Sequence, residues 1–263
     1  MKSHTIRLYG RFVLLHLKSQ MQYKASFALT VAGQFLTSFS AFLAIYFLFA
    51  RFHEVDGFSY PEVLLCFAVV LLSFSLAECF IRGFDTFSRM LGNGEFDRIL
   101  VRPRGTVFQV LASKLELSRI GRLLQAAVVL VYALPRAGVD WTAGRAAALF
   151  LMLVSCFCVF AGLFLLHAAL CFFTTEGLEV TNILTDGGRE FGAYPLAVYG
   201  RGVLSFFTYV VPLALCQYYP LLYLLGHTEE SWYLLLPLAG PLFLLPCYGV
   251  WRLGVRHFRS TGS

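Results

Sequence analysis

Six long apolar stretches, each close to the length that a helix needs to cross a lipid bilayer, constrain this chain more than any other feature. They cover about residues 25–50, 61–81, 115–134, 146–171, 202–225 and 232–251. A hydrophobic fraction of 58% with only 14% charged residues leaves too little polar surface for a water-soluble globule of 263 residues. The sequence therefore predicts an all-α integral membrane protein with six transmembrane helices, folded as a single transmembrane domain over residues 1–263.

Positive charge is distributed unevenly over these predicted spans. The chain has 21 Lys and Arg residues, and all but Arg51, Arg136 and Arg145 fall in alternate connections or in the two terminal segments. Because cytoplasmic segments carry the excess of Lys and Arg, both ends of the chain are expected in the cytoplasm of a cell (inner or plasma) membrane. Topology and anionic lipid headgroups account for the net charge of +6, and no motif indicates nucleic acid as a partner.

The segment before the first span, residues 1–24, has the pattern of a helix lying on the inner leaflet. Arg7, Arg11 and Lys18 fall in one angular sector, while apolar residues repeat at helical spacing on other faces. A frayed basic tail would also satisfy the charge bias. The sustained apolar spacing favours an interfacial amphipathic helix.

The cytoplasmic segment 82–114 contains a second short helix, from Glu95 to Arg102. Gly92 to Gly94 break the chain before this helix, and Pro103 with Gly105 break it afterwards. Its apolar residues are expected on one face, with acids in the first turn and basic residues toward the end. Such a helix is suited to docking into a groove of a soluble partner. The predicted docking residues are Glu95, Phe96, Asp97, Arg98, Ile99, Leu100 and Arg102.

Two stretches carry a resemblance to a known family. GEFDRILVRP followed by TVFQVL is similar to the cytoplasmic signature of the six-span ABC type-2 exporter permeases. REFGAYPLAVYGRGVLSFFTYVVPLALCQYYPLLYLLG resembles the segment that leads into the fifth span of those proteins. Their order and spacing relative to the spans extend the resemblance over essentially the whole chain.

The resemblance implies a permease subunit that forms the translocation pathway with a second permease, as a homodimer or heterodimer. This chain has no G-x-x-x-x-G-K-[ST] phosphate loop, so ATP and Mg would be bound by separate ATP-binding subunits and no cofactor by this chain. By the same resemblance, Glu95 to Arg102 would be the coupling helix and Arg7 to Lys18 the connecting helix. The proline-bearing region between spans five and six would form a pair of partly inserted outer helices.

Ionisable and aromatic residues inside the predicted spans are further candidates. Glu78 and His167 lie near inner span ends, where each either pairs with neighbours or serves the pathway. Phe206, Tyr209 and Leu213 are three and four residues apart, as on one helical face. We expect Glu78 and this span-five face at the interface between permeases or in the pathway.

Two other classes of function remain open. A proton-coupled secondary transporter of small hydrophobic or cationic compounds would need mid-membrane carboxylates or an inverted repeat. A membrane-embedded enzyme would need a convergent set of His and carboxylates, but the six His residues are scattered. We therefore expect neither a catalytic nor a metal site in this chain.

Overall fold

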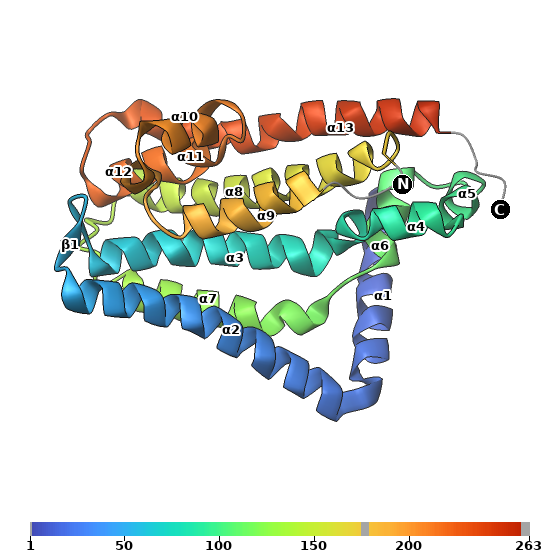
Figure 1. The fold of residues 1–263 in the computed structure, drawn as a ribbon, viewed down its shortest axis with the longest axis horizontal. Helices are drawn as coiled ribbons and strands as arrows, with labels where there is room; N and C mark the ends of the chain where they lie inside the picture. Colours follow the sequence, from blue (N-terminus) through green and yellow to red (C-terminus); the bar gives the residue numbers. More distant parts are fainter. Residues whose placement is uncertain (1, 175–178, 259–263) are drawn as a thin grey trace.

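The computed structural model describes residues 2–174 and 179–258 as a bundle of helices that lie side by side (Figure 1). The four longest bundle helices are α2 (Lys24–Arg51), α3 (Tyr60–Asp85), α8 (Ala143–Leu170) and α13 (Ala239–His257). Two shorter helices, α7 (Ile120–Ala133) and α9 (Glu179–Gly192), complete the bundle. Helix α3 is almost entirely buried and packs against α2, α7, α8 and α9, so it forms the centre of the core.

Four helical stretches in the described residues are long and apolar enough to cross a membrane. They are Ile6–Arg51, Tyr60–Gly92, Ala143–Leu170 and Ser231–His257, and a fifth is possible if the bent pair Arg201–Tyr209 and Leu213–Leu225 counts as one span. The chain is thus an all-α membrane protein, as predicted. Helix α7, at the predicted third span, has 14 residues, so at 1.5 Å per residue it is only about 21 Å long.

One end of the bundle carries a tight hairpin between α2 and α3 (Figure 1). Strands β1 (Glu54–Val55) and β2 (Phe58–Ser59) pair across Asp56 and Gly57, which both have positive φ as a two-residue hairpin turn requires. Helix α3 begins directly afterwards, where the Glu62 carboxylate accepts bonds from the Ser59 N–H at 2.7 Å and the Ser59 hydroxyl at 2.8 Å. This capping box fixes the start of the central helix.

Helix α1 (Lys2–Gln20) lies across the opposite end of the bundle (Figure 1). The 3-10 turn η1 (Met21–Tyr23) separates it from α2. Its Tyr9 hydroxyl donates to the Phe80 carbonyl at 3.2 Å, and its His16 ring lies 3.0 Å from the Ala112 carbonyl. The predicted N-terminal helix is therefore present and held across the helix ends, and its place at the membrane surface stays a prediction.

Glycines allow backbones to touch at two places near α1. A Cβ at Gly121 of α7 would lie 2.2 Å from the Val31 carbonyl oxygen of α2, and one at Gly83 would lie 2.1 Å from that of Val110. Any larger residue would push these helices apart.

The predicted fifth span, 202–225, is wrong as one continuous helix. The structure has three short helices there, α10 (Arg201–Tyr209), α11 (Leu213–Cys216) and α12 (Tyr218–Leu225), and the direction changes by 83° at the break. Pro212 lies in the break, where it lacks an N–H and clashes with the preceding turn. The 3-10 turns η3 (Leu196–Tyr199), η4 (Ser231–Leu234) and η5 (Leu236–Leu238) connect these helices to α9 and α13.

Helix α9 lies within the bundle, although residues 172–201, between the predicted fourth and fifth spans, were expected to form a cytoplasmic connection. Its Thr181 contacts His167 of α8, and further along α9 a Cβ at Gly192 would contact Val70 of α3. Helix α9 therefore runs antiparallel to α8 and enters the bundle to about the middle of α3 (Figure 1).

Candidate functional site

Segment 82–114, which was predicted to be cytoplasmic, contains three short helices after the end of α3, at the end of the bundle where α1 lies. They are α4 (Phe87–Gly92), α5 (Glu95–Leu100) and α6 (Thr106–Ser113). Gly94 has a φ of +67° and turns the chain into α5. The predicted short helix is thus present, between the breaks that the sequence indicated.

Phe96 and Ile99 of α5 point into the core of the protein, which contradicts their assignment to an exposed docking face. Phe96 is fully buried and its ring lies 5.1–5.2 Å from those of Phe87, Phe172 and Phe258. Trp251 of α13 joins this aromatic cluster from the other side. The apolar periodicity of α5 was identified correctly, but its buried face packs against α4, α13 and Phe172, which follows α8.

The exposed part of α5 and its C-terminal turn form a different surface. Leu100 is 43% exposed and the adjacent Val101 is 83% exposed. Glu95 and three arginines, Arg98, Arg102 and Arg104, are also exposed around them, while Asp97 is half-buried. We name Arg98, Leu100, Val101, Arg102 and Arg104 the cytoplasmic knob, after the side of the membrane that was predicted for this segment. Only three of these five, Arg98, Leu100 and Arg102, were predicted as docking residues.

A groove of about 360 Å³ lies beside the cytoplasmic knob. Helix α1 forms one wall through Leu8 and Phe12, and α6 forms another through Phe108. Arg98, Arg102 and Arg104 also line this groove. An apolar floor with basic edges gives this end of the protein a concave surface next to a projecting one.

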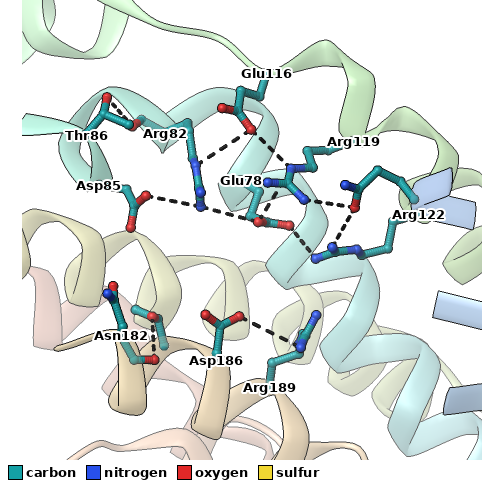
Figure 2. Close-up of polar contacts among 12 residues, drawn as sticks. Glu78, Arg82, Asp85, Thr86, Glu116, Arg119, Arg122, Asn182, Asp186 and Arg189 are labelled. Atoms are coloured by element: carbon teal, nitrogen blue, oxygen red, sulfur yellow. Dashed lines mark hydrogen bonds and ion pairs between the residues drawn. The ribbon is translucent and has the colours of Figure 1, made fainter. Parts of the chain in front are cut away.

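A buried ion-pair network joins α2, α3 and the start of α7 (Figure 2). The Glu78 carboxylate, only 4% exposed, pairs with Arg122 at 2.6 Å, Arg82 at 3.4 Å and Arg119 at 3.7 Å. The Gln34 side-chain oxygen accepts from Arg119 at 2.8 Å and from Arg122 at 2.7 Å. The sequence indicated that Glu78 pairs with neighbours, as it does with Arg82, but it did not indicate the two arginines about 40 residues away, Arg122 in α7 and Arg119 directly before it.

Glu116 extends this network outside the bundle helices, in the connection before the 3-10 turn η2 (Leu117–Arg119). It lies 3.1 Å from Arg119, 3.3 Å from Lys114 and 3.7 Å from Arg82. Burial alone would raise the pKa of the Glu116 carboxyl, but these three cations outweigh it and hold that pKa below its ordinary value. Glu116 is therefore ionised at neutral pH and balances part of the arginine charge.

The predicted span-five face does not exist as a single face. Phe206 is partly exposed and Tyr209 is 85% exposed on α10, whereas Leu213 begins α11 and is fully buried. The break at Pro212 separates them. Glu78 and His167 are both buried in side-chain contacts, His167 against Thr181, so neither projects from the surface of the subunit.

A family profile described as ABC-2 family transporter protein matches residues 35–262. The chain belongs to the ABC-2 transporter family. No curated protein and no solved structure gives a match. As an ABC-2 permease, the chain is a multi-pass membrane protein of the plasma membrane and a transport subunit, and the family works with ATP-binding subunits in general.

Proposed function

We propose that this chain is the permease subunit of an ABC exporter, driven by separate ATP-binding subunits that bind ATP and Mg and dock at the cytoplasmic knob. A second permease, identical or related, would complete the translocation pathway. On this proposal the chain itself performs no chemistry and binds no nucleic acid. The lipid bilayer and the two kinds of subunit are its partners.

The proposed topology has six crossings, α2, α3, α7, α8, α9 and α13, with both ends in the cytoplasm. Helix α9 begins the fifth crossing, which 202–225 alone was expected to form, because α9 runs back along α8 from its inner end to about the middle of α3; α10 to α12 complete this crossing (Figure 1). Helices α10 to α12 then correspond to the partly inserted outer helices that the family resemblance implies. In this topology Arg189 and Arg201 no longer lie on the cytoplasmic side. The basic residues of α1, of segment 82–122 and of the end of α13 remain there.

The observation that carries the docking proposal is the exposure of Leu100 and Val101 among three exposed arginines, beside an apolar groove. Apolar side chains at the centre of a charged rim are the arrangement that protein interfaces use. The buried face of α5 connects this surface to Phe172 after α8 and to Trp251 of α13. A displacement of the cytoplasmic knob by a docked subunit would therefore be transmitted to α8 and α13 through this rigid aromatic packing.

The exposed face of α9 supports the proposal that a second permease completes the pathway. Asn182, Asp186 and Glu190 are spaced four residues apart and are all exposed on a helix that lies within the bundle. Charged side chains facing lipid at this depth are costly, so they are expected to face protein or a water-filled pathway. We therefore place the pathway along α9 and the adjacent face of α2, in place of 202–225.

Val101→Asp tests the docking proposal directly. The substitution places a carboxylate at the centre of the apolar contact, so we expect co-purification of the ATP-binding subunit to fall by about tenfold or more. Pull-down of the ATP-binding subunit on the tagged permease, followed by ATP turnover of the recovered complex, measures the effect.

Trp141→Asp is the matched control. Trp141 is an exposed apolar residue between α7 and α8, at the end of the bundle that carries the hairpin. Full recovery of the ATP-binding subunit with this control is expected. Wild-type recovery with Val101→Asp would contradict the docking surface.

A proton-coupled secondary transporter is a second candidate. It needs carboxylates within the membrane, and Asp186 and Glu190 lie on a helix of the bundle. It requires no ATP-binding subunit. Transport by the reconstituted permease alone, driven by a pH gradient, would favour this candidate, and transport only with ATP and the second subunit would exclude it.

A further inference from the structure

One cavity lies at the middle of the bundle, between α2, α3, α7 and α9. It has a volume of about 360 Å³. Its polar side comprises Thr37, Ser38, Ser40, Arg122, Arg189 and Glu190, and its apolar side Ala41, Ala44, Phe67, Leu71 and Ala193. We name it the polar cleft. Thr37 and Ser38 lie halfway along the 28-residue helix α2, so this part of the polar cleft is at mid-membrane depth.

Several polar atoms of the residues that line the polar cleft have no partner in the described protein. They are the Ser38 hydroxyl and the Nε atoms of Arg122 and Arg189. Ser38 and Arg122 are each only 6% exposed. Leaving a buried polar group unpaired is destabilising, so three of them around one cavity indicate donors that a bound group would satisfy.

The two arginines are held differently. Arg122 is fixed by Glu78 and Gln34, which hold its guanidinium in one orientation. Arg189 pairs with Asp186 (Figure 2) and also with Glu190, and the side chains of these two acids are 64% and 63% exposed. Exposed ion pairs are weak, so Arg189 can exchange these carboxylates for another anion at little cost.

We propose that the polar cleft binds the anionic headgroup of an amphiphilic cargo, a carboxylate or a phosphate, between Arg122 and Arg189. This inference rests on the proposed exporter function. The planar guanidinium groups and the Ser38 hydroxyl match the acceptors of such a headgroup. Phe67, Leu71 and the three alanines contact the adjoining apolar part of the cargo.

Direct binding to the full-length permease in lipid nanodiscs tests this inference. The probe is 11-(dansylamino)undecanoic acid, and its methyl ester is the neutral control with the same chain and fluorophore. We expect the acid to bind on the order of tenfold more tightly than the ester. Equal affinities would overturn the inference.

Variants locate the site. Arg189→Gln is expected to remove most of the acid-over-ester preference, and Arg189→Lys to retain part of it. Ser38→Ala removes a hydroxyl that has no partner among the described residues, so the fold is preserved and the acid is expected to bind about threefold more weakly. Arg201→Gln, at the start of α10, is the matched control and should leave the preference unchanged. A preference that survives both Arg189→Gln and Ser38→Ala would overturn the site.

Competition distinguishes the two sources of an anion. Decanoate should displace the probe, whereas millimolar inorganic phosphate should not, because it lacks the apolar chain. Displacement by phosphate alone at these concentrations would overturn the assignment to an amphiphile.

Recovery of the ATP-binding subunit is measured separately. Loss of probe binding with normal recovery of that subunit would therefore contradict this inference and leave the exporter function intact.

Discussion

Glu78→Gln is expected to destabilise the folded protein by about 3 kcal/mol, because removing one member of a buried ion pair leaves the other charge uncompensated. The glutamine keeps the size of the side chain but leaves Arg122, Arg119 and Arg82 without the carboxylate that now lies between them (Figure 2). A large decrease in the melting temperature of the detergent-purified protein, followed by tryptophan fluorescence, would measure the effect.

Two further variants test whether the loss of the ion-pair network causes the destabilisation of Glu78→Gln. Glu95→Gln changes an exposed glutamate of α5 and should leave the melting temperature unchanged. The double variant Glu78→Gln with Arg122→Gln removes both charges of the closest pair, so its loss should be smaller than the sum of the two single losses. A melting temperature of Glu78→Gln equal to that of the wild type would show that the network contributes nothing to stability.

Phe96→Ala should cost a similar amount, about 3 kcal/mol or more, because it leaves a cavity among tightly packed aromatic rings. Phe96 is fully buried against Phe87, Phe172 and Phe258. Loss of this packing should also release α5, so limited proteolysis is expected to cut the segment around Gly94 much faster in the variant.

Val101→Ala, directly after the same helix, is expected to give the opposite result. Its side chain is largely exposed, so the melting temperature should stay near that of the wild type while retention of the ATP-binding subunit decreases. If Phe96→Ala instead weakened retention without affecting melting, Phe96 would belong to the docking face and the orientation of α5 described above would be wrong.

The long apolar helices could be predicted closely from the sequence. Residues 25–50, 61–81 and 146–171 were expected as spans, and the helices are Lys24–Arg51, Tyr60–Asp85 and Ala143–Leu170. Uniform apolar runs of this length have no alternative structure in lipid, so their ends follow from composition. The short helix α5 could be predicted because Gly92 and Gly94 break the chain before it and Pro103 and Gly105 break it afterwards.

Helix α9 could not be predicted in the same way. Its 14 residues include Asn182, Asp186, Arg189 and Glu190, so it resembles a cytoplasmic connection by composition. Its place follows from close long-range packing: a Cβ at Gly188 or Gly192 would meet side chains of α3, α8, α10 and α11, which local sequence patterns do not reveal. Conversely, 202–225 is apolar enough for a span, but the break at Pro212 bends it by 83°.

The orientation of α5 was missed for a related reason. Periodicity shows that Phe96 and Ile99 share a face, but an apolar face packs equally well against the protein itself or against a partner. Only the aromatic cluster with Trp251 and Phe172 decides between them. The polar cleft was likewise beyond the sequence, because its residues come from four separate helices.

Crosslinking from the cytoplasmic knob is the most direct test of the central claim, that α5 transmits the action of an ATP-binding subunit to the bundle. A cysteine is introduced by Val101→Cys in a variant whose seven native cysteines are replaced by serine or alanine. The purified complex is treated with a photoactivatable maleimide and analysed by mass spectrometry. The proposed docking predicts a crosslink to the ATP-binding subunit whose yield changes when ATP is added. A complex that retains its ATP-binding subunit but gives no crosslink from position 101, while position 141 does, would contradict it.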